Sequence, residues 1–411
     1  MPRVLLLLPT RSYRIPDFLS AAERLGVDVT VASEEPSTME RLNPEGLLTL
    51  DFADLAASAA RAAEFAGRHP VAAVVGVDER TAIAAAAISE RLGLPHDPVE
   101  AVQAAGNKAR MRALLARAGA PQPAFRLHDV AEDPAAVAGT TAFPCVLKPT
   151  FLAASRGVIR ANDRAQFAEA WRRIARILEE PGVAARGGAA AREILVEGYV
   201  AGMEVALEGL LDAGALRVLA LFDKPDPLSG PYFEETIYVT PSRLPADVQA
   251  GCAEAAEAGA RALGLSRGPV HAEMRINDDG VFLIELAARS IGGLCSRTLR
   301  FGTGLSLEEL ILRHALGMPA SGEERERLAA GVMMIPIPKG GVLEDVRGLE
   351  AARAIPDVVD VTISAASGRP IVPLPEGDRY LGFIFSRAET PGRAEAALRE
   401  AHARLEFVIR D

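Results

Sequence analysis

The sequence predicts an α/β protein with several domains, and three observations support this class. The chain has 411 residues, a length typical of two or three domains. Residues 1–95 alternate between aliphatic runs at 4–9, 27–33 and 71–77 and stretches with helical spacing at 16–25 and 53–68. Near-continuous apolar strands joined by helices indicate a parallel sheet covered on both faces.

The rest of the chain continues as a mixture of helices and strands. Helices are expected at 98–105, 107–118, 163–179 and 245–263, and strands at 143–148, 157–161, 193–200, 203–211 and 215–223. The segment 181–191, "PGVAARGGAAA", has the composition of a flexible surface excursion. After residue 320 we expect a final α/β unit, with strands near 331–337, 357–364 and 380–386 and a helix at 391–405.

Composition argues against several classes of protein. No apolar run approaches the ~20 residues of a membrane span, and the opening "MPRVLLLLP" is shorter than the ~7–15 residues of a signal core. The net charge of −10 argues against nucleic acid as a partner. Cys145, Cys252 and Cys295 form neither a disulfide framework nor a zinc pattern, which fits a cytoplasmic protein. No G-x-G-x-x-G follows the first strand, so dinucleotide chemistry loses its main support.

Lysine is rare in this chain. Of 45 basic residues only four are lysines, namely Lys108, Lys148, Lys224 and Lys339. A lysine that persists where arginine is the usual base indicates a need for a compact ammonium. We apply this interpretation to the first three and regard Lys339 as an ordinary surface residue.

Two glutamates flank a predicted hairpin. In "VHAEMRINDDGVFLIEL", Glu273 and Glu285 lie in apolar runs on either side of 278–280. A two-residue turn at 279–280 would put them on opposite faces, whereas a three-residue loop with Gly280 in the left-handed position pairs them on one face. The third-place glycine favours the three-residue loop. Opposed carboxylates repel, and a divalent cation would compensate; the alternative is two solvated strand residues.

Two further stretches suggest a nucleotide site. "FPCVLKPTFLAASRGV" places Lys148 at the end of an apolar strand, before a small-residue loop that contains Ser155, and such a combination can hold phosphates. "ILVEGYVAGMEVALEGLL" places Glu197 and Glu204 seven residues apart at strand ends. A carboxylate suits a ribose diol, and a strand backbone can contact an adenine edge.

The order of these stretches resembles the ATP-grasp superfamily of carboxylate–amine ligases. The resemblance covers roughly residues 1–320 and is carried by "NKARMRALLARAGAP", "FPCVLKP", "VEGYVAGME", "HAEMRIND" and "IELAAR" in that order. "FDKPDPLSGPYFEETIYVTPSRLP", "HAE" and the C-terminal stretch look most like L-amino-acid ligases and carnosine-synthase-like enzymes. The resemblance implies an N-terminal parallel α/β domain (1–97), two α+β ATP-grasp subdomains (98–190 and 191–320) and a small C-terminal α/β unit (321–411).

The resemblance also implies a nucleotide site. Lys108 and Lys148 fall where the family places lysines against the ATP phosphates, and a mobile loop covers those phosphates. That loop contains Ser155, Arg156, Gly157 and Val158. Glu197 and the backbone of Tyr199 and Val200 match the adenine-reading strand, and Glu204 matches the ribose-binding carboxylate.

The metal and catalytic positions follow in the same way. Glu273 and Glu285 match the Mg²⁺ ligands, with Mn²⁺ as an alternative, and Arg289 matches the arginine that faces the transferred phosphate and the reacting carboxyl. Many relatives carry asparagine two residues after the second glutamate, where this chain has Ala287, which leaves the number of metal ions open. Arg289 could instead pair structurally with Glu273.

Other residues are expected to serve catalysis or the substrates. His271 shares a strand face with Glu273 and could orient a substrate or accept the amine's proton; a neutral, hydrogen-bonded structural histidine is the alternative. Lys224 and Glu235 lie in a Pro/Gly-rich loop expected to border the substrates, unless it is an ordinary hairpin loop. Gly292 and Gly293 would let backbone approach a substrate, or would simply form a turn.

The expected reaction joins a small-molecule carboxylate to an amine through an acyl phosphate, with ATP converted to ADP. Arg289 and Lys148 would neutralise the developing charge. Two alternatives are an ATP-dependent carboxylase that activates bicarbonate and a non-catalytic ATP-binding regulator. The sequence does not name the acid or the amine, and a homodimer is the expected assembly.

Overall fold

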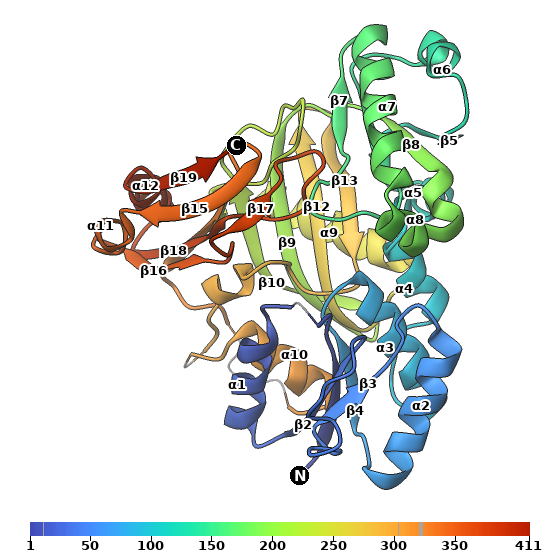
Figure 1. Ribbon diagram of the computed structural model, residues 1–411, viewed down its shortest axis with the longest axis vertical. Helices are drawn as coiled ribbons and strands as arrows, with labels where there is room; N and C mark the ends of the chain where they lie inside the picture. The colour runs from blue at the N-terminus through green and yellow to red at the C-terminus, as the bar shows by residue number, and fades with distance from the viewer. Residues whose placement is uncertain (11, 303, 320–323) are drawn as a thin grey trace.

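The computed structural model describes residues 1–411 except 11, 303 and 320–323. The N-terminal domain, blue in Figure 1, is a four-stranded parallel sheet in the order β3-β2-β1-β4. Its strands are β1 (Arg3–Leu7), β2 (Asp28–Ser33), β3 (Leu47–Thr49) and β4 (Ala73–Gly76), and its helices are α1 (Ile15–Leu25), α2 (Leu55–Arg68) and α3 (Glu79–Leu92). The strand order reverses between β1 and β4, so their adjacent carboxyl ends form a topological switch point, the usual place for a ligand in such sheets.

The small subdomain, green at the opposite end of Figure 1, is a four-stranded antiparallel sheet in the order β5-β8-β6-β7. Two helices, α4 (Val99–Ala105) and α5 (Lys108–Arg117), lead into it. Its other elements are β5 (Phe125–Asp129), α6 (Pro134–Thr140), β6 (Cys145–Pro149), β7 (Ile159–Ala161), α7 (Arg164–Glu179), α8 (Pro181–Gly187), η1 (Gly188–Arg192) and β8 (Glu193–Gly198).

The flexible excursion predicted at 181–191 is wrong. This stretch forms α8 and most of η1. Pro181 begins the helix at a position where its missing N–H costs nothing, and Val183 is buried in the subdomain core. Burial of the single Val183 side chain therefore orders a segment of small residues, although the sequence shows no long apolar pattern there.

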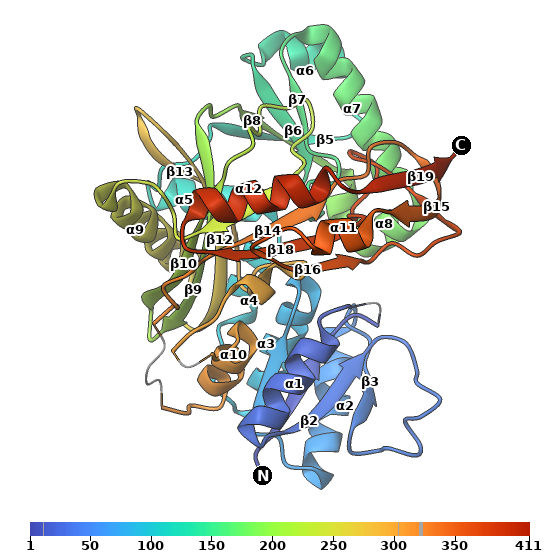
Figure 2. The ribbon, with the colours of Figure 1, turned by 90° about the vertical axis from the view of Figure 1, so that its left-hand side faces the viewer.

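An eight-stranded antiparallel sheet lies between the two ends of the molecule, in the order β13-β12-β9-β10-β11-β14-β18-β16. Its strands are β9 (Met203–Asp212), β10 (Ala215–Lys224), β11 (Ile237–Thr240), β12 (Gly268–Asn277), β13 (Gly280–Ala287), β14 (Ala329–Ile335), β16 (Val358–Ile363) and β18 (Gly382–Ala388). Helix α9 (Ala246–Leu263) packs on β13 and β10, and α12 (Pro391–His402) packs on β14 and β18, as Figure 2 shows for α12.

The C-terminal part of the chain is joined to this sheet rather than set beside it. The boundary expected after residue 320 lies outside the described residues, and strands from both sides of it pair as β11 with β14. A second sheet, β17-β15-β19, consists of β15 (Gly341–Arg347), β17 (Arg369–Ile371) and β19 (Glu406–Arg410), with α11 (Leu349–Arg353) nearby. The helix expected at 391–405 ends at His402, and β19 follows it.

Residues after β13 return to the N-terminal domain. The short η2 (Cys295–Thr298) leads towards α10 (Leu307–Ala315), which packs beside α1 in Figure 1. Arg14 pairs with Glu308 at 3.2 Å, and Arg24 pairs with Glu309 at 2.9 Å. These ion pairs hold the N-terminal domain against α10. Among the described residues, no helix combines the length and apolar character needed to cross a membrane.

The hairpin pairs Glu273 with Glu285, as predicted, but for a different reason. The turn has two residues, Asp278 and Asp279, since Asn277 pairs with Gly280; the expected three-residue loop is wrong. The register then shifts by one residue at a β-bulge, which leaves Ile284 unpaired opposite β12. The bulge, and not the turn, brings the two carboxylates opposite each other.

A buried arginine holds this bulge. Arg112 of α5 is fully buried and donates to the carbonyl oxygens of Leu283 (3.1 Å) and Ile284 (2.5 Å). Its Nε also donates to Glu197 at 2.6 Å. One guanidinium therefore satisfies backbone oxygens that the bulge frees from the ladder and neutralises a buried carboxylate.

We predict that Arg112→Met lowers the free energy of unfolding by about 3–5 kcal/mol, because Glu197 would lose a buried counter-charge and the bulge would lose two donors. Arg110→Met, an exposed change in the same helix, should stay within about 0.5 kcal/mol. Urea denaturation followed by circular dichroism measures both. Equal effects of the two substitutions would show that the buried guanidinium does not hold the hairpin.

Candidate active site

A cavity of about 1380 Å³ opens between the N-terminal domain, the small subdomain and the large sheet. Most of the residues expected from the sequence line it: Lys108, Lys148, Ser155, Arg156, Val158, Glu197, Tyr199, Val200, Glu204, Glu235, His271, Glu273, Glu285, Arg289, Gly292 and Gly293. Gly157 and Lys224 are not among the described residues that line it. Residues more than 250 positions apart in the chain therefore face one space.

Lys148 and Glu197 form a buried ion pair on neighbouring strands β6 and β8. Lys148 Nζ lies 2.7 Å from Glu197 Oε2, and Arg112 occupies Oε1. Burial lowers the pKa of Lys148 from its ordinary value, although Glu197 opposes the shift. For Glu197, burial opposes ionisation, but Arg112 and Lys148 outweigh it and lower its pKa. The Lys148 side chain is thus fixed by Glu197 at the wall of the cavity.

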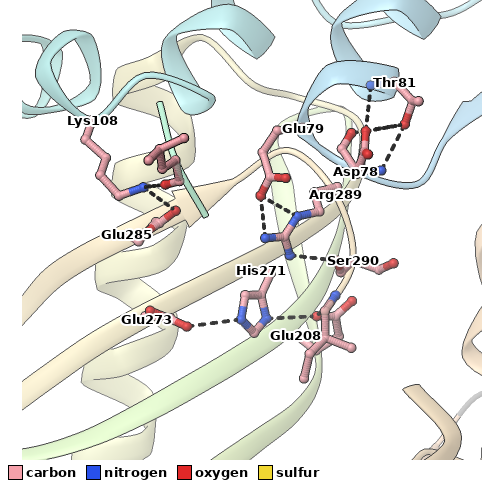
Figure 3. Close-up of polar contacts among 12 residues, drawn as sticks. Asp78, Glu79, Thr81, Lys108, Glu208, His271, Glu273, Glu285, Arg289 and Ser290 are labelled. Atoms are coloured by element: carbon pink, nitrogen blue, oxygen red, sulfur yellow. Dashed lines mark hydrogen bonds and ion pairs between the residues drawn. The ribbon is translucent and has the colours of Figure 1, made fainter. Parts of the chain in front are cut away.

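Lys108 links the start of α5 to the loop after β6. Its Nζ donates to the Leu152 carbonyl at 2.7 Å and to Glu285 Oε1 at 3.2 Å, and its backbone N–H donates to the Thr150 carbonyl. Figure 3 shows Lys108 and Glu285 pointing towards each other. The ammonium is therefore within reach of both the small-residue loop and one of the paired carboxylates.

Around Glu273 three carboxylates crowd together. Ligand oxygens of Glu204, Glu235 and Glu273 lie within 4.8 Å of one another. Lys224 pairs with all three, and Arg275 Nε lies 2.8 Å from Glu204. Lys224 thus lies among the carboxylates, rather than at the edge of the cavity.

Burial and crowding set the ionisation of this cluster. Burial and the neighbouring Glu273 raise the pKa of Glu235 to about 7. Burial opposes ionisation of Glu273, but Lys224 and His271 outweigh it and hold the pKa of Glu273 well below its usual range. Lys224 already lies among these three carboxylates, and Glu273 also lies opposite Glu285 in the hairpin. Oxygen donors of this kind suit Mg²⁺ or Mn²⁺.

His271 lies between two carboxylates. Its Nδ1 is 3.2 Å from Glu208 and its Nε2 is 3.6 Å from Glu273, as Figure 3 shows. Burial opposes its protonation, but the contacts with Glu208 and Glu273 prevail and raise the pKa of His271 to about 9. Both ring nitrogens therefore face carboxylates, an arrangement that favours orientation over the expected role as proton acceptor.

Arg289 takes its partner from the N-terminal domain. Its Nε lies 2.8 Å from Glu79 Oε1, its second terminal nitrogen contacts the same oxygen, and the other donates to the Ser290 carbonyl at 2.9 Å. Glu79 begins α3, and Asp78 caps that helix through Thr81 (Figure 3). The suggested structural pairing of Arg289 with Glu273 is not what this structure shows; the partner is Glu79.

The comparisons with known proteins agree with this geometry. Residues 141–298 match the ATP-grasp domain, residues 19–96 match the ATP-grasp N-terminal domain, and residues 333–410 match the L-amino acid ligase C-terminal domain 2. The chain belongs to the ATP-grasp superfamily. Within it, the third match makes this chain L-amino-acid-ligase-like.

Individual relatives of this ATP-grasp chain include ligases that act on amino acids by name. The crystal structure of an L-amino acid ligase from Bacillus licheniformis superposes with a TM-score of 0.84 and is 26% identical, covering 100% of this chain and 99% of that one. Carnosine synthase 1 of Gallus gallus is 32% identical over 64% of this chain and 30% of its own length. Alanine–anticapsin ligase of Bacillus subtilis is 29% identical over 60% of this chain and 54% of its own length. The matched region therefore spans about a third of the carnosine synthase and about half of the alanine–anticapsin ligase.

The loop after β6 in this ATP-grasp chain is held in an unusual backbone conformation. Ala154 and Ser155 have φ of +54° and +55°, and Gly157 has φ of +73°. A Cβ at Gly157 would meet Pro149 Cγ at 2.8 Å, so this glycine is needed both for its φ and for space. Non-glycine residues in the left-handed region persist only where surrounding contacts hold them, and they cluster at ligand clamps.

The two glycines after Arg289 differ in their surroundings. Gly293 has φ of +62°, and a Cβ there would meet Phe383 Cε1 of β18 at 3.1 Å. A Cβ at Gly292 would meet nothing within 4 Å. Gly293 therefore serves packing against β18, whereas space for a substrate remains at Gly292.

Sequence reasoning missed three residues that the ATP-grasp site uses. Glu79 follows the predicted strand 71–77, and a carboxylate at the carboxyl end of a parallel strand is a usable signal. Glu208 interrupts the apolar run of β9, accepts from the Ile291 N–H at 2.9 Å and contacts His271. A charged residue inside an apolar strand is also a usable signal of a functional position. Arg112 has none, because arginines are frequent throughout its helix.

We predict that Lys148→Arg weakens ATP binding by tenfold or more, which is about 1.4 kcal/mol, because a guanidinium cannot replace an ammonium packed between Glu197 and Arg112. Lys339→Arg is the matched control, since Lys339 is exposed and pairs with Asp411 near the chain end. Calorimetric titration with ATP measures both. Unchanged affinity with an intact fold would place Lys148 outside the nucleotide site.

Proposed function

We propose that this protein is an ATP-dependent carboxylate–amine ligase that forms an amide bond between amino-acid-like substrates and releases ADP and phosphate. The observation that carries the proposal is the shared cavity: it is lined by two lysines, two opposed glutamates and Arg289. The C-terminal match to L-amino acid ligases supports amino-acid-like substrates over bicarbonate. Three buried free thiols fit the reducing cytoplasm.

Binding of ATP is assigned to the part of the cavity nearest α5 and β8. Lys108 and Lys148 would contact the phosphates, and the loop 151–158 would cover them. Glu204, held by Arg275 and Lys224, presents a fixed carboxylate to a ribose diol. Glu197 is fully engaged by Arg112 and Lys148, so in this proposal it positions the lysine while the backbone of 199–200 contacts the adenine.

Glu273 and Glu285 would hold Mg²⁺, or Mn²⁺ in its place, and the bound cation offsets the negative charge of the phosphate oxygens. Lys108, which contacts Glu285 in this structure, would turn towards the phosphates. His271, held by Glu208, would orient a substrate carboxylate or phosphate rather than remove a proton.

In the first step a carboxylate oxygen attacks the γ-phosphorus, and the bond from that phosphorus to the bridging oxygen breaks to give an acyl phosphate and ADP. Arg289, aligned by Glu79, would neutralise the reacting carboxylate and the transferred group. In the second step the amine attacks the carbonyl carbon, loses a proton, and phosphate leaves. Positioning and charge neutralisation account for catalysis of this kind.

The product nucleotide tests the proposal. We predict that pairs of amino acids release ADP and free phosphate, because Arg289 and the lysines favour transfer of the γ-phosphoryl group. A coupled ADP-release screen over amino-acid pairs, with and without bicarbonate, followed by chromatography of the nucleotides, measures this. AMP would reject the acyl-phosphate route, release dependent on bicarbonate alone would indicate a carboxylase, and no turnover despite ATP binding would indicate a regulatory protein.

Removal of one metal ligand tests the carboxylate assignment. We predict that Glu285→Gln lowers ADP formation by at least about a hundredfold while the fold persists, because the amide carries no charge for the cation. Glu344→Gln, an exposed change that breaks the pair with Arg410, is the control. Initial rates over a magnesium titration measure both. Near-normal turnover at saturating magnesium would contradict the assignment.

A further inference from the structure

The segment 372–380, which joins β17 to β18, contributes to the lining of the cavity and touches the loop proposed to cover the phosphates. The Gly157 N–H donates to the Pro375 carbonyl at 2.9 Å, and Arg156 Nε donates to the Glu376 carbonyl at 2.7 Å. Both donors belong to the small subdomain and both acceptors to the C-terminal part of the chain. The local sequence does not predict this contact, because Arg156 and Glu376 are 220 residues apart in the chain.

A bidentate ion pair strengthens the contact. Arg173 of α7 donates through two nitrogens to the two carboxylate oxygens of Glu376, the longer contact measuring 2.9 Å. Burial opposes ionisation of Glu376, but Arg173 outweighs it and lowers the pKa of Glu376. Arg173 also donates to the hydroxyl of Tyr232, in the loop between β10 and β11. Two loops, 372–380 and the loop between β10 and β11, therefore meet at one guanidinium of α7.

The same segment also contributes side chains to the wall of the cavity, where we expect the substrates to bind. Its residues Asp378, Arg379 and Tyr380 line the space, and the Tyr380 ring packs against Phe383 with centroids 6.2 Å apart. A segment that touches both the phosphate-covering loop and the substrate space can transmit closure from one to the other.

We propose that Glu376 is a positioning residue: through Arg173 it holds the segment 372–380 against the loop 151–158 and so closes the cavity over the acyl phosphate. This proposal rests on the proposed function. An acyl phosphate that meets water returns to carboxylate and phosphate, whereas one that meets the amine gives the amide and phosphate. Closure therefore decides how many ATP molecules are consumed per amide formed.

The test compares Glu376→Gln, Arg173→Gln and the double variant with the wild-type protein. Glu376→Gln removes the carboxylate charge but keeps the carbonyl that Arg156 uses. Asp357→Asn is the matched control, because it breaks the 2.8 Å pair with Arg393 in the same part of the chain, and Asp357 is not among the described residues that line the cavity. Circular dichroism checks that each variant is folded.

Two readouts are measured. The first is the ratio of ADP to amide, which should rise about threefold to fivefold in each single variant, the range expected when a partly exposed ion pair is lost. The ratio should rise no further in the double variant, because Glu376 and Arg173 act as one pair. The second is the rate of trypsin cleavage after Arg156 in the presence of Mg²⁺ and ATP, read by mass spectrometry and expected to rise by a similar factor. The control should change neither.

Unchanged cleavage in Glu376→Gln would overturn the proposal, as would faster cleavage with an unchanged ratio of ADP to amide. If the wild-type protein forms no amide from any amino-acid pair, the proposed function fails, and the cleavage rates alone decide whether Glu376 holds the loop closed.

Discussion

The buried guanidinium of Arg112 is the interaction on which the arrangement of the candidate site depends. It neutralises Glu197, which in turn holds Lys148, and it binds the carbonyl oxygens at the bulge that brings Glu285 opposite Glu273. The lysine proposed to face the phosphates and a carboxylate proposed to hold the metal are thereby positioned by the same side chain. The cost of burying this charge is offset because every contact it makes is to a carboxylate or a carbonyl.

Electrostatic balance explains much of the rest of the cavity. Glu204, Glu235 and Glu273 converge around Lys224, Arg275 pairs with Glu204, and burial together with the neighbouring Glu273 raises the pKa of Glu235 to about 7. In the proposed function an acidic chain builds a site for a polyanion from local charges: Glu273 and Glu285 would hold the divalent cation, and the lysines and Arg289 would face the phosphates. The charge at the site, and not the net charge of −10, is what ATP would meet.

The site is also a meeting point of distant parts of the chain. Glu79 from the N-terminal domain aligns Arg289, and the ion pairs of Arg14 and Arg24 with α10 keep that domain in place. The C-terminal strands extend the large sheet, and the segment 372–380 reaches the loop 151–158. No single domain contains the proposed chemistry, so relative motion of these parts would open or close it.

The sequence by itself determined the fold class, most of the strands and helices that carry the candidate residues, and the order of the motifs by which the superfamily is recognised. These follow from periodicity and from short stretches in which neighbours in sequence are neighbours in space. The partners of the key charges were decided only by the tertiary structure: Glu79 for Arg289, Glu208 for His271, Arg112 for Glu197 and Arg173 for Glu376. So was the bulge at Ile284, which corrected a register that the turn alone would have set wrongly. The physical reason is that an ion pair across dozens to hundreds of residues, or a one-residue shift held by such a pair, leaves no periodic trace in the chain; it exists only once packing has brought the two charges together.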